Sequence, residues 1–386
     1  MRRVNLLCIL LSLAAPAAAL ELNADISAGY AGHLHSTDPR TTERGMKLQG
    51  KLTHDEQHFG IRAEGRLRWN DAYRSDAYSE VARDAYRFSG DWRELYATSY
   101  VGGWNVSLGL QQVVWGKADN LRVVDQVNPV DLREFVLPDL NDYRKPVMML
   151  RGVRMLGDWS LEMLYLPRFK PTSFAKPGSE YDIPLLDPQT LQSVLLLPEK
   201  RPSNRFSNGE VGMHLSRSFE ALDLSLFAFH TWDDNPVYRT IMLPDAAGNP
   251  VPALQAEYRR QFMTGLSAAR AIGHGMVIRA ELAYVPNYAY MVSSGSADGL
   301  AESATLTGLV GLDYNWRDWL LAVQTSDRYI EDWNRAYAVR KHAQVVTFSA
   351  TGSSLSGRLD SRIAYTTFPD SRDGNWLQLK STWKPD

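Results

Sequence analysis

Regular alternation of apolar and charged side chains is the property that most limits the folds open to this chain. From position 59 to position 69, the odd positions carry Phe59, Ile61, Ala63, Gly65, Leu67 and Trp69. The even positions from 62 to 68 carry Arg62, Glu64, Arg66 and Arg68. Successive side chains of a β-strand point to opposite faces, whereas a helix would mix the two sets. The segment is therefore predicted to be a strand with one face in an apolar medium and the other in water.

The alternation recurs in later segments, such as 276–284, 305–314 and 358–365. Extended along the chain, it predicts sixteen strands, near 24–34, 45–54, 57–69, 91–101, 103–115, 146–156, 159–167, 208–218, 221–231, 256–271, 274–285, 302–314, 317–328, 342–351, 355–366 and 375–383. Most reach the 9–11 residues that a tilted strand needs to cross a bilayer. The charged residues expected to line an aqueous lumen, where they would mainly solvate and balance the wall, are Arg62, Glu64, Arg66, Arg68, Arg279, Glu281, Arg358, Asp360 and Arg362.

The connections between these strands alternate between tight turns and long segments. The long segments lie near 70–90, 116–145, 168–207, 232–255 and 286–301. Outer-membrane barrels have short periplasmic turns and long external loops. A soluble sandwich would bury one face of each sheet, and charges would then lie in its core. The chain is therefore predicted to be all-β, a transmembrane antiparallel up-and-down β-barrel of about sixteen strands in a Gram-negative outer membrane.

The first nineteen residues have the features of a secretory signal peptide. Arg2 and Arg3 are followed by the apolar run 6–13 and by small residues that end at Ala19. We expect residues 1–19 to be removed and residues 20–386 to form one barrel domain. The single cysteine, Cys8, lies in the segment to be removed, which excludes disulfides and cysteine nucleophiles from the mature chain.

The charge and composition of the chain limit which binding partners are expected. The formal net charge of −2 gives no reason to expect nucleic acid, and no stretch after the signal approaches the eighteen uncharged apolar residues of a helical span. No cofactor is expected, because the phosphate, dinucleotide and calcium motifs are missing. His33 and His35 share a strand face without a third ligand, so no metal site is expected. The expected partners are the lipid bilayer and a small-molecule solute.

Residues 103–146 carry two short motifs. The first runs from Gly109 through Gln111 and Trp115 to Gly116, and the second is Asp125-Gln126-Val127-Asn128-Pro129-Val130-Asp131, followed by Arg144-Lys145-Pro146. They resemble a large bacterial family of outer-membrane barrels known only as a domain of unknown function, whose members carry G-x-Q-x-x-x-W-G and then D-x-x-N-P-x-D. The motifs cover about forty residues. The resemblance implies association with inner-membrane pumps of the resistance-nodulation-division type and with a periplasmic carrier for hydrophobic compounds.

The residues of the same segment support a separate argument. By strand order, this segment is the third external loop. It is unusually apolar for such a loop, and its apolar residues are Leu121, Val123, Val124, Val127, Val130, Leu132, Phe135, Val136, Leu137 and Leu140. Such side chains need burial, and the enclosed space nearby is the barrel interior. We therefore expect an inward-folded constriction or hatch. Its site residues are predicted to be Gln111, Trp115, Asp125, Asn128, Pro129, Asp131 and Arg133. The polar members either only fix turns and pair with lumen arginines, or form part of a ligand gate.

Three functions remain open. The first is a channel for a small hydrophobic or amphipathic compound, restricted by the third loop, and the others are a general diffusion porin for small polar solutes and an outer-membrane hydrolase. His214 near Ser216 is a spacing that arises by chance in a strand, so we expect no enzyme. The fourth loop, 168–207, holds six prolines and the apolar run 194–197. It is expected either to pack over the barrel mouth or to collect a hydrophobic ligand.

Overall fold

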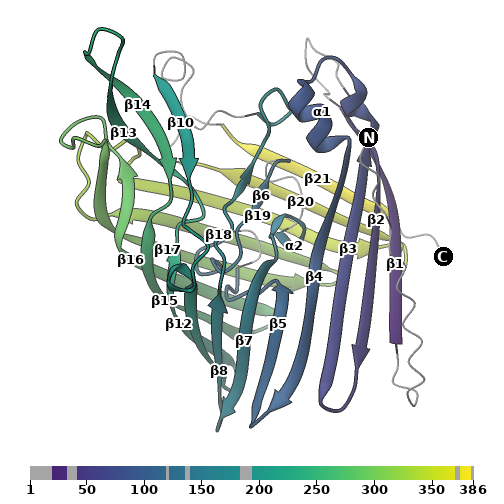
Figure 1. The fold of residues 1–386 in the computed structure, drawn as a ribbon. Coiled ribbons are helices and arrows are strands. Elements are labelled where there is room, and N and C mark those ends of the chain that lie inside the picture. The colour runs from purple at the N-terminus through teal and green to yellow at the C-terminus, as the bar shows by residue number, and fades with distance from the viewer. Residues whose placement is uncertain are drawn as a thin grey trace.

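The computed structural model describes residues 20–32, 41–118, 121–134, 140–182, 194–369 and 374–383. Sixteen of its strands form one sheet (Figure 1), in which each is antiparallel to the strand before it. They are β1 (Leu20–Gly32), β2 (Thr41–Asp55), β3 (Phe59–Asn70), β4 (Phe88–Val101), β5 (Trp104–Gln111), β7 (Val147–Leu156), β8 (Trp159–Leu166), β11 (Glu210–Ser218), β12 (Leu222–Trp232), β15 (Arg260–Gly273), β16 (Met276–Met291), β17 (Leu300–Trp316), β18 (Trp319–Ile330), β19 (His342–Ser354), β20 (Leu359–Thr367) and β21 (Trp376–Trp383). The predicted count of sixteen strands is confirmed, and each predicted strand overlaps one of these.

The sheet curls around a central space. β1 and β21 stand at the two ends of the strand order, yet Ser27 of β1 and Lys380 of β21 line the same cavity. Tight turns join alternate strand pairs at one end of the sheet, which we call the short-turn end. Gly102 and Gly157 occupy left-handed conformations there, with φ of +57° and +60°. The longer connections lie at the opposite, long-loop end (Figure 1).

The two faces of the sheet differ as the alternation predicts. In β3, Leu67 is 47% exposed on the outer face, whereas Arg66 beside it is 4% exposed on the inner face. In β17, Val310 is 57% exposed and Leu309 is 3% exposed. Exposed apolar side chains on the outside suit contact with lipid tails, where a charge would cost about 2–4 kcal/mol.

The long connections carry further elements. The β3–β4 loop holds η1 (Asp71–Arg74) and α1 (Glu80–Tyr86), and the β5–β7 loop (residues 112–146) holds β6 (Asp131–Leu132) and α2 (Leu140–Tyr143). The β8–β11 loop holds β9 (Ser173–Phe174), β10 (Leu195–Lys200) and η2 (Phe206–Asn208), and the β12–β15 loop holds β13 (Val237–Pro244) and β14 (Pro250–Glu257). β6 pairs with β9, and β10, β14 and β13 form a small sheet. No described helix is long and apolar enough to span a membrane.

The fourth loop packs over the long-loop end. Ser79 at the start of α1 donates its backbone N–H to Gly178 and its hydroxyl to Pro177. The apolar Leu195–Leu197 pairs with β14 in parallel. These contacts agree with the packing interpretation of that loop.

Several predicted features lie outside the described residues. These are the signal segment 1–19, His33 and His35, and the apolar residues 135–137 of the third loop. The predicted strand 103–115 is too long, because β5 ends at Gln111. Two residues later, the backbone N–H of Val113 donates to the side chain of Asn128 at 2.7 Å, so this N–H does not bond to a neighbouring strand.

Candidate functional site

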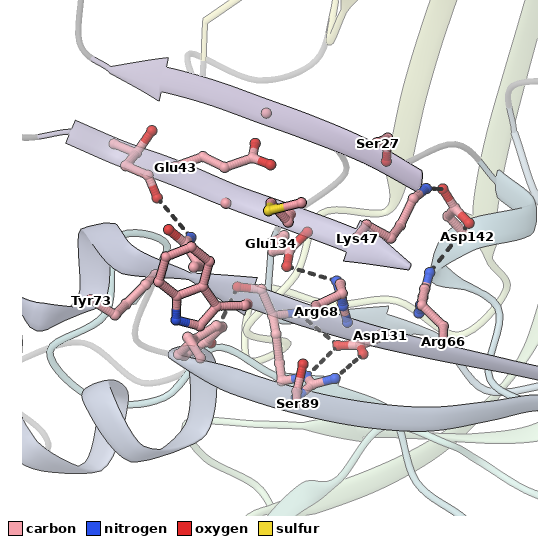
Figure 2. Close-up of a pocket in the computed structure, with 18 of the residues that line it drawn as sticks. Ser27, Glu43, Lys47, Arg66, Arg68, Tyr73, Ser89, Asp131, Glu134 and Asp142 are labelled. Carbon is pink, nitrogen blue, oxygen red and sulfur yellow. Dashed lines mark hydrogen bonds and ion pairs between the residues drawn. The ribbon is translucent and has the colours of Figure 1, made fainter. Parts of the chain in front are cut away.

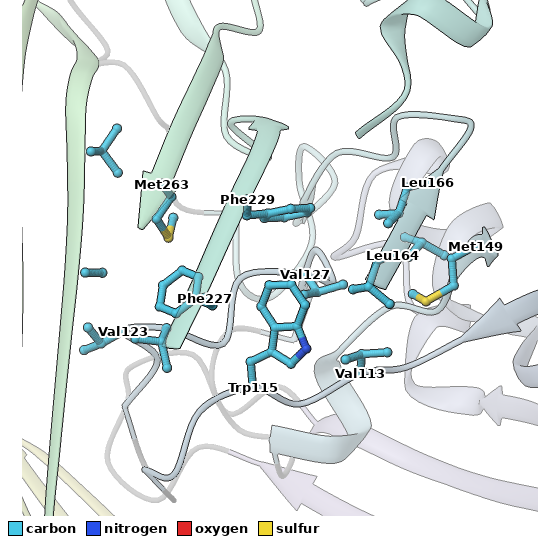
Figure 3. Packing of buried hydrophobic residues seen from close by; sticks show 14 of the residues in the cluster. Val113, Trp115, Val123, Val127, Met149, Leu164, Leu166, Phe227, Phe229 and Met263 are labelled. Atoms are coloured by element: carbon cyan, nitrogen blue, oxygen red, sulfur yellow. The ribbon is translucent and has the colours of Figure 1, made fainter. Parts of the chain in front are cut away.

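The apolar side chains of the β5–β7 loop pack against inward-facing residues on one side of the sheet (Figure 3). The loop contributes Val113, Trp115, Val123, Val124 and Val127, all at most 4% exposed. The wall contributes Val147, Met149, Leu164, Leu166, Phe227, Phe229, Met263, Ala283, Val285 and Leu309. These wall residues come from β7, β8, β12, β15, β16 and β17. Burial of this many apolar groups fixes the first half of the loop to that side.

Trp115 is the largest loop side chain in this cluster. Its ring stacks on His214 of β11, with centroids 5.4 Å apart and planes at 11°. Phe227 and Phe229 of β12 surround the same ring, with centroids 5.9 and 5.7 Å away. His214 also faces Glu162 of β8 at 3.7 Å. His214 therefore forms part of the packing around the loop.

Asn128 ties together the two ends of the loop. It is fully buried, and its Oδ1 accepts from the backbone N–H of Val113. Its Nδ2 donates to the carbonyl of Gln111 at 3.0 Å and to that of Lys145 at 2.8 Å. The carbonyl of Pro129 accepts from the N–H of Lys145 at 2.8 Å. One side chain thus bonds to backbone groups at the beginning and at the end of the segment.

Gln111 and Asp125 are buried beside this junction. Gln111 is 2% exposed, and its Nε2 donates to the carbonyl of Met149 at 3.1 Å. Asp125 accepts from Arg144 at 2.5 Å and lies 3.4 Å from the Nε of Arg122. Arg122 also donates to the carbonyl of Asn128 at 2.8 Å. Two arginines of the loop itself therefore compensate the buried charge of Asp125.

Two residues predicted to line the lumen bind the loop backbone. The carboxylate of Glu281 on β16 accepts from the N–H groups of Lys117 at 2.5 Å, Ala118 at 2.8 Å and Val124 at 3.2 Å. Arg279 donates to the carbonyl of Lys117 at 2.8 Å and also pairs with Asp313. Hydrogen bonds to a carboxylate are stronger than neutral ones. These contacts go beyond the predicted solvation of the wall.

Asp131 and Arg133 pair with each other inside the loop, with Arg133 donating at 2.8 Å and 2.5 Å. Burial acts to raise the pKa of Asp131, but the hydrogen bonds and the charge of Arg133 outweigh it and hold that pKa below its ordinary value. Lys145 donates to the carbonyl of Pro171 and to Ser173 at 2.5 and 2.7 Å. Burial lowers the pKa of Lys145 to about 8. The β6–β9 pairing and Lys145 join the third loop to the fourth.

On its other side the loop faces a cavity of about 360 Å³ between itself and the N-terminal strands. Figure 2 shows ion pairs that connect the loop to this wall. Arg68 of β3 donates to Glu134 at 2.8 Å. Asp142 of α2 lies 3.3 Å from Arg66 of β3 and 3.7 Å from Lys47 of β2. Arg66 additionally pairs with Asp91 of β4 at 3.0 Å.

The remaining predicted lumen residues include two that bond to side chains of the wall itself. Arg62 pairs with Asp55 at 3.1 Å, near the short-turn end. Glu64 accepts from Gln49 at 2.7 Å. Arg358, Asp360 and Arg362 lie on or beside β20, where Ser353 donates to Asp360. The predicted lumen set is therefore divided among the loop contacts, the cavity and the short-turn end.

Sequence reasoning missed the loop's ionic partners Arg122, Glu134, Asp142 and Arg144, and Lys47 on the wall. One signal was present, because Arg144 is part of the quoted Arg144-Lys145-Pro146 motif. Glu134 and Asp142 carried no comparable signal, since their partners lie more than sixty positions away in the sequence.

Solved structures share this fold. OmpF of Salmonella typhi, in a complex with daunomycin, is 12% identical, with a TM-score of 0.51 over 90% of both chains. OmpT, an outer membrane protein of Vibrio cholerae in its trimer form, is 9% identical, with a TM-score of 0.50 over 96% of both chains. A loop-deletion mutant of that OmpT is 9% identical at a TM-score of 0.50, covering 95% of this chain and 99% of its own. Likeness at such identity shows the fold, which is that of these outer-membrane β-barrels.

No curated protein matches the sequence. A family match covers nearly the whole chain, so it extends far beyond the forty residues that suggested a family of unknown function. The link to pumps and carriers stays a prediction. Since residues 7–384 match the family described as protein of unknown function DUF1302, the chain belongs to that family.

Proposed function

We propose that the protein is an outer-membrane channel for a small hydrophobic or amphipathic compound, with the β5–β7 loop as its constriction. The observation that carries this proposal is the packing of the loop's apolar residues on the inward-facing side chains of six wall strands. Such packing supports a loop that narrows the lumen, which in a barrel of this size would otherwise be filled with water. An open lumen ringed by charges, as expected of a general diffusion porin, would need no such cluster.

The attachment of the loop supports a restricted passage. It is held by apolar burial on one side and by charged groups on the other, with Asn128 joining its two ends. Among the described residues, a cavity lies between the loop and strands β1 to β3, so a solute that uses it passes beside the loop or displaces it. The alternative hydrolase gains no support from His214, whose ring is stacked on Trp115.

The setting of the channel belongs to the same proposal. The channel would be exported with a cleaved signal at 1–19 and would lie in a Gram-negative outer membrane. It would be passive, and a periplasmic carrier and an inner-membrane pump would set the direction of flow. The exposed apolar outer face, with residues such as Leu67 and Val310, supports the membrane part.

Conductance in planar bilayers tests the constriction. We expect wild type to be nearly silent and a deletion of about residues 119–140 to open large steps, because the deletion removes the loop from the lumen. A matched control shortens another external segment, the exposed hairpin tip at 246–248 between β13 and β14, and should leave the conductance low. Free conduction by wild type would contradict the constriction and favour a general porin.

A further inference from the structure

The two sides of the β5–β7 loop are held by different forces. On the side of β7 to β17 it is fixed by close apolar packing and by the carboxylate of Glu281. On the side of β2 and β3 it is held by the ion pairs of Glu134 and Asp142. The loop carboxylates in these pairs are partly exposed, 41% for Glu134 and 33% for Asp142, so a solute carboxylate can take their places. Arg66 itself is buried and keeps its second partner, Asp91. The edge along β2 and β3 is therefore the one that a ligand can release.

The charges of the cavity are divided by element (Figure 2). The wall lines it with Lys47, Arg66, Arg68 and Lys380 and with one acid, Glu43. The loop lines it with Asp131, Glu134 and Asp142 and with one cation, Arg133, which is bound to Asp131. Glu134 and Asp142 are thus carboxylates presented to a cationic wall. They occupy the places that the carboxylate of a solute would take.

Aromatic side chains complete the long-loop end of the same cavity. Tyr73 and Tyr86 stack with ring centroids 4.7 Å apart and are almost fully buried, whereas Tyr143 and Tyr181 line the space as partly exposed side chains. Burial raises the pKa of Tyr181 to about 12, so its hydroxyl is neutral and can donate a hydrogen bond. Tyrosine rings offer flat apolar surface beside a polar group, which suits an amphipathic aromatic molecule. At about 360 Å³ the cavity falls in the lower range of small-molecule pockets.

We propose that this cavity binds small aromatic monocarboxylates, with the ring among the tyrosines and the carboxylate on Arg68, Arg66 and Lys47. The bound carboxylate takes the place of Glu134 and Asp142 and so releases the edge of the loop. This inference rests on the proposed channel function and names the chemical class of its solute.

The first test is calorimetric binding of 3-phenylpropionate, and of the neutral 3-phenylpropanol, to the purified chain in detergent micelles. We expect the carboxylate to bind about tenfold more tightly than the alcohol, because only the carboxylate gains charge-assisted hydrogen bonds. Arg68→Gln should remove most of that preference. Equal affinity for the two compounds, or no binding of the carboxylate, would overturn the inference.

The second test separates competition from damage. Glu134→Gln and Asp142→Asn remove the competing carboxylates, so each should tighten 3-phenylpropionate binding several-fold, whereas misfolding would weaken it. The matched control is the pair Arg217 and Asp158 at the short-turn end, also 2.8 Å apart. Arg217→Gln and Asp158→Asn should leave the affinity unchanged. Weaker binding in the Glu134 and Asp142 variants would contradict displacement.

These outcomes are distinct from those of the conductance experiment. A deletion of 119–140 that opens large steps, combined with no preference for the carboxylate, would reject this inference and keep the channel. Free conduction by wild type would reject the constriction itself.

Discussion

A single asparagine holds the base of the β5–β7 loop closed. Asn128 makes three side-chain hydrogen bonds to backbone groups of Val113, Gln111 and Lys145, which come from both ends of the loop. The bonds to Val113 and Gln111 are buried and the bond to Lys145 is partly buried, so loss of the side chain leaves at least two backbone groups without water in reach. The position therefore controls whether the loop stays compact.

We expect Asn128→Ala to destabilise the loop by on the order of 3 kcal/mol, because three hydrogen bonds are lost and at least two of their backbone partners stay buried. The sheet itself should remain folded. Amide hydrogen exchange at Val113 measures the effect, which should be a large loss of protection there and none in the centre of β17. The exposed Asn249 in the β13–β14 turn is the control, since Asn249→Ala should leave Val113 protected. Unchanged exchange at Val113 would contradict the assigned role.

Asp131 makes the stability of the loop depend on pH. Its pKa is held below the ordinary value, so the unfolded loop binds its proton before the folded loop does. The stabilisation is therefore fully present above the ordinary aspartate pKa of about 4 and is lost as pH falls through the lower folded value. We expect protease resistance of the loop to be constant from about pH 8 to pH 5 in this respect and to fall below about pH 4. Asp131→Asn should remove that acid step, and a variant that keeps it would show another group to be responsible.

For single residues, the sequence was a good guide to which residues belong to the loop site. It was a poor guide to the atoms that those residues contact. From the sequence, Asn128 is expected either to fix a turn or to form part of a ligand gate, but its partners lie fifteen to seventeen positions away in the chain. Irregular backbone has no period from which such distances can be inferred. The same limit applies to Glu281, whose partners are about 160 positions away.

At the scale of elements, the strands were predictable because two media act on every one of them. Lipid on one side and the interior on the other impose the period of two that placed all sixteen strands. Errors occurred where a loop interferes with a strand, as at the end of β5. They also occurred at strand ends, since β16 continues to Met291, six residues past its predicted end at 285.

Strand β16 anchors the loop, and its carboxylate offers a direct test. We expect Glu281→Gln to raise the frequency of large conductance steps, because a neutral amide accepts more weakly from the N–H groups of Lys117, Ala118 and Val124. Single-channel recording in planar bilayers measures the change. The exposed acid Glu302 on β17 serves as the control, and Glu302→Gln should leave the steps as rare as in wild type. If Glu281→Gln were equally silent, apolar packing alone would hold the loop.

At the scale of the whole molecule, the expectation of a polar lumen was only partly right. The wall of β2 and β3 is charged inside, but β12 turns Phe227 and Phe229 inward to meet Trp115. The sequence Leu-Phe-Ala-Phe at 226–229 signals this, since it is apolar on both faces of its strand. The alternation of apolar and polar residues identifies a strand whose two faces differ. The alternation is weaker in a strand such as β12, whose inner face is apolar because it packs against the loop.

The outer face can be tested by placing one charge on each side of the same strand. Val310→Arg puts a cation on the exposed apolar face of β17, and we expect it to cost about 2–4 kcal/mol of membrane-inserted stability. Thr307 is on the inner face, so Thr307→Arg should cost much less. Urea unfolding of both variants in lipid vesicles gives the comparison. Equal losses would mean that the outer face does not contact lipid.

The strictly sequential strand order has a consequence for the time course of assembly. Each hairpin can form from neighbouring parts of the chain, which is fast because little entropy is lost in closing short segments. The third loop is different, since Lys117 meets Glu281 across a separation of 164 residues. The loop is therefore without its final partners until β16 is in place. Until then its apolar residues lack their partners on the later strands β12, β15, β16 and β17, and this is the interval in which a chaperone could bind them.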